Sequence, residues 1–359
     1  MLARGSNSSR GIVSADPTHG ADAAPLIRLD EVDVRFKVRR RGRARKATLI
    51  AVDAVSLEVH DGEVLGVVGE SGSGKSTLGR AMIGLQPPTS GRVEIGGRAL
   101  DPRAKQGMEA RRHGLQMVFQ DPLGSLNPRL TVGASLAEPL RNGRVARSAI
   151  SSRVRELLDD VGLPSAFVSR YPHELSGGQQ QRVAIARALA TDPRAIVLDE
   201  AVSALDVSTQ AQIVNLLIEL RAAKKLTYVF ISHDISLVNY ISTRVAVMYL
   251  GRVVELGAVD ELARDGLHPY TVALRSAVPE VDPRLEAKRE RILLQGPLPS
   301  PVDRPSGCRF HTRCPVARLD HCSVDDPPLR ELEPERWVAC HYPRSLTPGT
   351  VDAAEVKAS

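Results

Sequence analysis

Apolar positions between residues 26 and 100 come in short runs separated by glycine and aspartate turns, and residues 64–68 are an example. Such runs are typical of β-strands. The next stretch, residues 76–85, contains no proline and repeats large apolar side chains at helical spacing, which is the pattern of a helix. The sequence therefore predicts a strand, a loop at residues 69–75 and then a helix.

The rest of the pattern changes twice along the chain. Residues 106–187 predict a mainly helical segment, whereas the continuous apolar runs at residues 195–198 and 228–231 are typical of strands that are buried on both faces. Prolines recur beyond Pro279 and argue against long regular elements there. We find no internal repeat, and we place a boundary near residue 280.

Composition divides the chain into four parts. Residues 1–24 are rich in serine, glycine, alanine and aspartate and lack an apolar signal-peptide core, so we expect a disordered leader. We expect the large domain at residues 25–280, a small extension with all four cysteines at residues 281–345, and a polar tail at residues 346–359. No run approaches the roughly 18 to 20 apolar residues that cross a bilayer, and we expect a cytoplasmic protein.

The composition is that of a globular protein, since 42% of the 359 residues are hydrophobic and 25% are charged. Aromatic residues make up only 3%, which is too few to stack nucleic-acid bases, so we expect no nucleic-acid partner. Much of the formal net charge of +6 comes from the basic run at residues 39–46. We expect a solvated loop there, with contact to anionic lipid head groups as the alternative.

A phosphate-binding motif follows the first buried strand. Residues 69–76 fit GxxxxGK[ST] and stand between a predicted strand and a predicted helix, which is where the mechanism of a P-loop requires them. The glycines let backbone N–H groups point at phosphates, Lys75 adds a cation, and the Ser76 hydroxyl can hold Mg²⁺. The flanking elements disfavour a chance glycine-rich turn. The candidate ATP-binding residues here are Gly69, Glu70, Ser71, Gly72, Ser73, Gly74, Lys75, Ser76 and Thr77.

Two carboxylates supply the second half of a hydrolysis site. The apolar run that ends in Leu198 is followed by Asp199 and Glu200, at the carboxyl end of a strand, where ligands bind in open α/β sheets. Asp199 can bind Mg²⁺, and Glu200 can act as the general base on the attacking water. An apolar strand that ends in Asp-Glu is weak evidence by itself, but together with a P-loop it predicts a nucleotide hydrolase.

A third motif resembles the signature of the ATP-binding-cassette ATPases. It consists of Leu175, Ser176, Gly177, Gly178 and Gln179. The resemblance implies that a helix begins just after this pentapeptide and that its donors face the γ-phosphate held by the P-loop of a second subunit. The residues agree with this, because Ser176 is a good N-cap and the glycines permit close approach of a phosphate.

Further landmarks of the same family follow in order. Gln120 resembles the glutamine that touches Mg²⁺ and reports nucleotide state to membrane subunits, and His233 is similar to the switch histidine that contacts the γ-phosphate. Phe36 is a candidate for stacking on the adenine base, with core packing as an equal alternative. The resemblance thus implies the magnesium ligands Ser76, Gln120 and Asp199. It also implies a loop across a dimer interface, formed by Ser203, Ala204, Leu205 and Asp206.

Three longer segments, residues 120–128, 202–208 and 268–271, resemble the ATPases of the oligopeptide, dipeptide and nickel importers. The implied fold is α/β, a RecA-like P-loop core with an antiparallel β subdomain and a helical signature subdomain at about residues 121–187, followed by the cysteine-bearing extension. The implied partners are two transmembrane permease subunits, a second ATPase that is identical or homologous, and an extracytoplasmic solute-binding protein. The implied location is the cytoplasmic face of the cell membrane.

The resemblance leaves the solute open. We expect a peptide, although nickel and other small solutes are imported with the same type of ATPase. A soluble cassette that acts on nucleic acid is a weaker alternative, because such proteins usually carry a coiled-coil insertion or two cassettes. A GTPase is disfavoured because the Asn-Lys-x-Asp motif is absent.

Four cysteines lie in the proline-rich extension, Cys308, Cys314, Cys322 and Cys340. Clustered cysteines in a cytosolic protein are more often metal or redox sites than structural disulfides. Their pattern resembles the cysteine motif of the peptide importers, some of which carry a 4Fe-4S cluster on four thiolates. Zinc, with histidines 311, 321 and 341 as spare ligands, and free thiols remain as alternatives.

Overall fold

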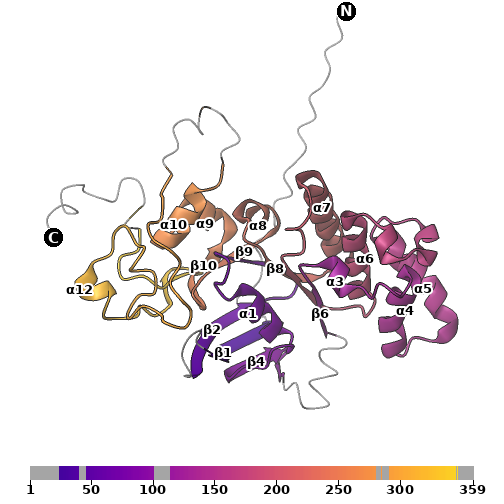
Figure 1. Ribbon diagram of the computed structural model, residues 1–359, viewed down its shortest axis with the longest axis horizontal. Helices are drawn as coiled ribbons and strands as arrows, with labels where there is room; N and C mark the ends of the chain where they lie inside the picture. The colour runs from indigo at the N-terminus through magenta and orange to yellow at the C-terminus, as the bar shows by residue number, and fades with distance from the viewer. Residues whose placement is uncertain are drawn as a thin grey trace, which may run out of the picture.

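The protein is described from a computed structural model, shown in Figure 1. The described residues are 24–39, 46–100, 114–279, 284, 291–344 and 346. Residues 1–23 of the expected leader, the core of the basic run, the start of the middle segment, the expected boundary at residue 280 and residues 347–359 of the polar tail lie outside these residues.

The central sheet has eight strands in the order β11-β12-β10-β9-β3-β8-β7-β6. The five strands from β9 to β6 in this order are parallel, while β10, β12 and β11 continue the sheet in antiparallel pairing. The strands are β3 (Val64–Val68), β6 (Leu115–Val118), β7 (Ala195–Asp199), β8 (Thr227–Ile231), β9 (Arg244–Tyr249), β10 (Arg252–Ala258), β11 (Arg330–Glu333) and β12 (Arg336–Val338). Every residue of β3, β7 and β8 is buried, which confirms the strands predicted from continuous apolar runs.

A second sheet is antiparallel and has the order β2-β1-β4-β5. Its strands are β1 (Ile27–Arg39), β2 (Lys46–Val59), β4 (Ser90–Ile95) and β5 (Arg98–Ala99). The helix α1 (Lys75–Met82) packs between this sheet and the central one. It carries Leu78 and Met82, which are fully buried in the core that the two sheets share.

The predicted helix at residues 76–85 is shifted in the structure. α1 begins at Lys75 and ends at Met82, because Gly84 adopts a positive φ of 67° that breaks the helix. Leu85 therefore leaves the helical face and is 45% exposed.

Helices between β6 and β7 form a lobe at one end of the molecule, as Figure 1 shows. They are α3 (Pro122–Ser125), α4 (Val132–Asn142), α5 (Arg147–Asp160), the 3₁₀ turns η1 (Ser165–Ser169) and η2 (Pro172–Glu174), and α6 (Gly177–Leu189). Buried Leu136, Leu157 and Val183 join α4, α5 and α6. The prediction of a mainly helical segment is confirmed for the residues described, but it missed the strand β6.

The remaining helices cover the sheet on the way to the extension. They are α7 (Val207–Lys224), α8 (Ile235–Ile241), α9 (Val259–Arg264) and α10 (Pro269–Ser276). The extension then contains α12 (Leu319–Cys322) and the β11–β12 hairpin, of which β12 pairs with β10. The prediction that proline would exclude long elements here is confirmed for the described residues. None of the helices described is long and apolar enough to cross a membrane.

Candidate nucleotide-binding and hydrolysis site

The P-loop turns from the end of β3 into α1 and wraps around its own lysine. The Lys75 Nζ donates to the Gly69 carbonyl at 2.7 Å and to the Glu70 carbonyl at 3.0 Å. Two glycines make the wrapping possible, since a Cβ at Gly69 would stand 2.2 Å from the Met248 carbonyl oxygen and one at Gly74 would stand 2.1 Å from the Ala51 carbonyl oxygen. The loop is thus tight enough to present backbone N–H groups to a phosphate.

Lys75 is almost fully buried, with 4% of its surface exposed. Burial lowers its pKa, although three nearby carboxylates favour the charged form. Its hydrogen bonds go to these two carbonyls and, at 3.5 Å, to the Ser73 hydroxyl, which are neutral groups, so the buried ammonium group gains strongly from an anionic ligand. Ser71 and Gly72, at the tip of the loop, are exposed.

The Ser76 hydroxyl and Asp199 lie against each other at the end of β7. The Ser76 Oγ donates to the Asp199 Oδ1 at 2.6 Å, and the Arg80 guanidinium lies 3.8 Å from the other carboxylate oxygen. Burial raises the pKa of Asp199, while the Ser76 hydrogen bond and the Arg80 charge lower it. A hydroxyl and a buried carboxylate are the hard oxygen ligands that Mg²⁺ prefers, so this donor set fits the ion.

Glu200 stands at the centre of the predicted catalytic residues. Its Oε2 accepts from the Gln120 Nε2 at 2.9 Å, and its Oε1 lies 3.5 Å from the His233 Nδ1. The backbone at Glu200 has a φ of 48°, a left-handed conformation that turns the side chain at the strand end and that is typical of functional sites. The structure therefore brings together Gln120, Glu200 and His233, which are far apart in the sequence.

The signature segment lies at the start of α6 and is exposed at Ser176 and Gly177. The Ser176 Oγ accepts from the Gln179 N–H at 3.4 Å, and the Gln179 Oε1 accepts from the Ser176 N–H at 3.0 Å, which is a capping box. The N-cap predicted at Ser176 is confirmed. The expectation that the helix begins just after the pentapeptide is wrong, because α6 begins at Gly177, inside it.

The predicted interface loop packs beside the signature segment. An added Cβ at Gly177 would lie 3.3 Å from Leu205, and one at Gly178 would lie 2.5 Å from Thr209. Asp206 caps α7 by accepting from the Thr209 N–H at 3.0 Å. Ala204 and Asp206 are exposed, and in the part of the chain that the structure describes, no hydrogen bond joins residues 175–179 to residues 69–77.

Phe36 lies on β1 opposite Leu49 of β2 and is partly buried against the core of the antiparallel sheet. This position is compatible with core packing. Its stacking on a base stays a prediction.

The four cysteines gather around one cavity of about 10 Å³, which His268 and His341 also line. None forms a disulfide. Burial raises the pKa of both Cys314 and Cys340 to about 12. In the described residues, no group of three or more His, Cys, Asp or Glu side chains is arranged to hold a metal ion. The cavity has room for about one water molecule, so the thiols would have to separate to enclose a metal cluster.

Sequence reasoning missed two residues that hold the P-loop from outside. Tyr270 and Arg313 both bond to Glu70, through its backbone N–H and its carboxylate respectively. Tyr270 stands in the segment 268–271 that carries the family resemblance, which was the available signal. The sequence around Arg313 carried no signal of this contact, because the residues are 243 positions apart.

Comparison with known proteins agrees with this geometry. The model of the ABC transporter family matches residues 52–203, and the model of the oligopeptide/dipeptide transporter C-terminal region matches residues 254–322. The structure is similar to the ATP-binding cassette MJ0796, solved as a dimer in a post-hydrolysis state with ADP and Pi. The TM-score is 0.58, with 32% sequence identity over 65% of this chain and 99% of that one.

Named relatives are similar over most of their length. The oligopeptide transport ATP-binding protein OppF of Salmonella typhimurium is 54% identical over 310 residues, which cover 85% of this chain and 92% of that protein. The putative oligopeptide transport ATP-binding protein YkfD of Bacillus subtilis is 50% identical over 326 residues, 89% of this chain and 96% of that protein. The fold and the site define an ATP-binding cassette, an enzyme that hydrolyses ATP. The chain belongs to the ABC transporter family, within the branch that carries the oligopeptide/dipeptide transporter C-terminal region.

Proposed function

We propose that the chain is the ATP-hydrolysing subunit of an importer that takes up peptides. The observation that carries the proposal is the convergence of Gln120 and His233 on Glu200, next to the Ser76–Asp199 pair. The names of the relatives, which are oligopeptide transport proteins, supply the solute class. They favour neither nickel nor nucleic acid.

In the proposed cycle, the Lys75 ammonium and the P-loop N–H groups bind the phosphates of ATP. The Ser76 hydroxyl and the Asp199 carboxylate would hold Mg²⁺, and the family resemblance implies Gln120, which bonds to Glu200, as a further ligand. Bound Mg²⁺ would neutralise phosphate charge. Glu200 accepts a proton from the attacking water, and Gln120 and His233 fix the orientation of its carboxylate.

The signature segment would complete the site of a second subunit. Two features support this proposal. Ser176 and Gly177 are exposed, and in the described part of the chain residues 175–179 make no hydrogen bond to residues 69–77. At the capped start of α6, the N–H groups of Gly177 and Gly178 have no partner among the described residues, and a γ-phosphate can bind to such groups. Two ATP molecules would then join two ATPase subunits, identical or homologous, and hydrolysis at Glu200 would release them.

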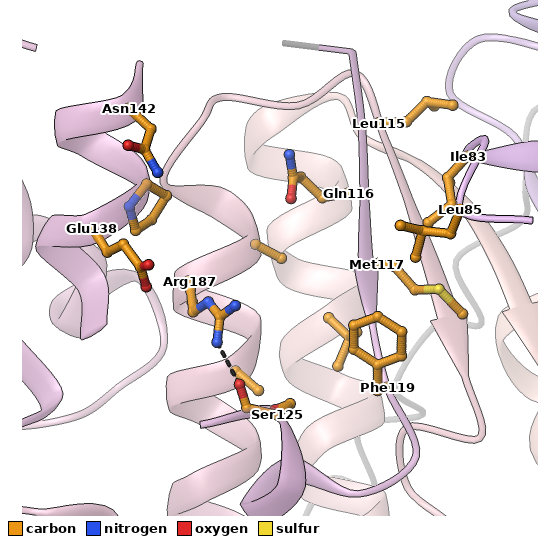
Figure 2. A pocket seen from close by; sticks show the side chains of 14 residues that line it. Ile83, Leu85, Leu115, Gln116, Met117, Phe119, Ser125, Glu138, Asn142 and Arg187 are labelled. Atoms are coloured by element: carbon orange, nitrogen blue, oxygen red, sulfur yellow. Dashed lines mark hydrogen bonds between the residues drawn. The ribbon is translucent and has the colours of Figure 1, made fainter. Parts of the chain in front are cut away.

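A groove beside Gln120 offers a surface for a permease subunit. It has a volume of about 340 Å³ and lies between the end of α1, the strand β6 and the helices α4 and α6. Figure 2 shows Leu85, Met117 and Phe119 on one side and Glu138, Asn142 and Arg187 on the other. Because Phe119 directly precedes Gln120, a permease segment that fills this groove would sense the nucleotide state.

The proposal that a permease binds in this groove can be tested by comparing substitutions of two exposed leucines, one inside the groove and one outside it. We expect Leu85→Glu to abolish co-purification with the permease subunits, because it places a charge on an apolar docking surface. Leu293 is 79% exposed and does not line the groove, so Leu293→Glu is the control that should assemble normally. Normal assembly of both variants would exclude this groove as the permease site.

The remaining assignments are part of the same proposal. The chain would act at the cytoplasmic face of the cell membrane, with two permease subunits and an extracytoplasmic solute-binding protein. The cassette would occupy residues 25–280, and the cysteine-bearing extension residues 281–345.

The cysteines carry a separate proposal, that their four thiols hold a 4Fe-4S cluster or zinc. The supporting observation is that thiols separated by up to 32 residues, from Cys308 to Cys340, line one cavity. Iron, acid-labile sulfide and zinc should be measured on protein purified without oxygen. A preparation with no metal and four titratable thiols would end this proposal.

The function is tested by reconstituting the chain with its permease subunits and binding protein in vesicles. We expect ATP hydrolysis to rise when oligopeptides are added with the binding protein. Stimulation by nickel salts but not by peptides would contradict the peptide assignment, and hydrolysis that depends on DNA or RNA would contradict transport.

A further inference from the structure

The extension is seated against the P-loop by a buried group of aromatic side chains. Tyr249 ends β9, Tyr270 lies in α10 and Phe310 lies in the extension, and each has at most 1% of its surface exposed. Their ring centroids are 4.8 to 5.4 Å apart, within the range of favourable aromatic pairs. The segment around Phe310 is therefore fixed to the carboxyl end of β9, the strand next to β3, and β3 leads into the P-loop.

The packing of these aromatic rings brings two polar groups into contact with Glu70, the second residue of the P-loop. The Tyr270 Oη accepts from the Glu70 N–H at 2.8 Å, and the Arg313 Nη1 donates to the Glu70 Oε2 at 2.8 Å. The Arg313 side chain is only 9% exposed and the Glu70 side chain is 27% exposed. A charge-assisted hydrogen bond that is shielded in this way is stronger than one in open solvent.

Glu70 carries a negatively charged side chain within the loop that would bind the triphosphate. Its carbonyl accepts from Lys75, and its carboxylate interacts electrostatically with the same ammonium group. A free carboxylate at this position would repel phosphate oxygens and compete with them for Lys75. The ion pair with Arg313 removes both effects, since it neutralises the carboxylate and holds it in place.

We propose that Arg313 is a positioning residue of the ATP site, which keeps the Glu70 carboxylate neutralised and away from the phosphates. Arg313 acts through Glu70 and does not touch ATP itself. The affinity of the P-loop for MgATP therefore depends on the extension being folded against the cassette. This inference rests on the proposed assignment of residues 69–77 as the ATP site.

The test is a double-mutant cycle between the two partners, with the MgATP dissociation constant and the steady-state kinetics as readouts. We expect Arg313→Met to weaken MgATP binding at least tenfold, and to raise KM more than it lowers kcat. In the Glu70→Gln background, where no carboxylate needs a partner, the same Arg313→Met change should weaken binding by less than threefold. An arginine that served only to pack on Tyr249 would cost the same in both backgrounds, and that outcome would overturn the proposal.

Two further variants separate the effect of the Arg313 charge from a general effect of replacing an arginine in the extension. Arg313→Lys keeps the positive charge, so this variant should bind MgATP more tightly than Arg313→Met does. If the two variants weakened MgATP binding equally, the electrostatic argument would be wrong. This comparison holds even if Arg313→Met folds poorly. Arg318→Met is the matched control, because this arginine of the extension is exposed and stacks on Tyr342, so it should keep the wild-type dissociation constant.

Lys75→Ala separates this proposal from the one on which it rests. If Lys75→Ala binds MgATP like the wild type, the assignment of the P-loop as the ATP site fails. If Lys75→Ala loses binding and Arg313→Met does not, only the role of Arg313 fails.

Discussion

The two halves of the proposed nucleotide site differ in how they are held. The P-loop half lies between β3 and α1, and its Lys75 and Asp199 are 4% and 2% exposed. The signature half, at the start of α6, is held by its own capping box and is exposed at Ser176 and Gly177. The first half is a finished binding surface within one chain, whereas the second offers donors that the described part of its own chain leaves unused.

The difference indicates how the work of a cassette is divided. Groups that hold ATP must be pre-organised, so they are attached to the buried ends of parallel strands. In the proposed function, groups that respond to a second subunit have to be accessible from outside, and the exposed start of α6 lies on the helical lobe. Variants in each half should therefore fail in different ways.

The largest effect is expected at Glu200. Glu200→Gln removes the general base but keeps the shape of the side chain, so ATP hydrolysis should fall by about 10²–10⁴-fold, while a nucleotide-bound dimer accumulates. Single-turnover hydrolysis and size-exclusion chromatography measure the two effects. Glu219→Gln is the control because Glu219 is exposed on α7. Hydrolysis at the wild-type rate by Glu200→Gln would refute the assignment of the base.

Lys75→Ala should weaken binding itself. It removes a buried cation from the phosphate loop, and the loss of a charge-assisted contact worth about 3 kcal/mol corresponds to an approximately 100-fold weaker MgATP complex. Isothermal titration calorimetry on the monomeric protein measures this. Lys37→Ala, at an exposed position of β1, should bind like the wild type.

A smaller effect is expected in the exposed half. Ser176→Ala removes the N-cap of α6, which should destabilise the protein by about 1 kcal/mol and weaken ATP-dependent dimerisation more than ATP binding by the monomer. Thermal unfolding and analytical ultracentrifugation test the two parts. Ser151→Ala, exposed on α5, is the comparison variant. If Ser176→Ala reduced the affinity of the monomer as strongly as Lys75→Ala, the contrast between the halves would be wrong.

The smallest effect concerns stability and pH. Burial raises the pKa of Asp199 above its usual 3.8. Above the folded-state pKa, the buried carboxylate is charged and lowers the free energy of unfolding of the nucleotide-free protein. Below pH 3.8 the carboxyl group is protonated in both the folded and the unfolded state, so this cost is absent. Asp199→Asn should raise the melting temperature at pH 7, and its difference from the wild type should shrink as the pH falls towards 3.8. The variant should gain little further stability from MgATP. Asp159→Asn, at an exposed position of α5, is the control for the loss of a carboxylate and should keep the wild-type melting temperature at pH 7.

Much of the cassette could be predicted because its motifs are local. The buried strands β3, β7 and β8 are continuous apolar runs, and the P-loop is one contiguous segment, so their spacing is visible in the sequence. β6 was missed because it is a four-residue edge strand that directly precedes a loop and a helical lobe. Its pairing with β7 is not encoded in a long apolar run.

The contacts around Glu70 were unpredictable for a different reason. Glu70 reads as a variable position of the P-loop motif, and its partners Tyr270 and Arg313 are 200 and 243 residues away. Only the folded chain brings them together. The helix start at Gly177 was placed too late because the capping box, and not the end of the motif, decides where α6 begins.

The pairing of β10 with β12 has a practical consequence for anyone who shortens the chain. Glu255 and Leu256 face Val338 and Trp337 across that pairing. A fragment that stops near residue 280 would leave the outer backbone groups of β10 without partners and open to strands of other molecules. Such a fragment should precipitate during expression, and so the minimal soluble motor must include the hairpin.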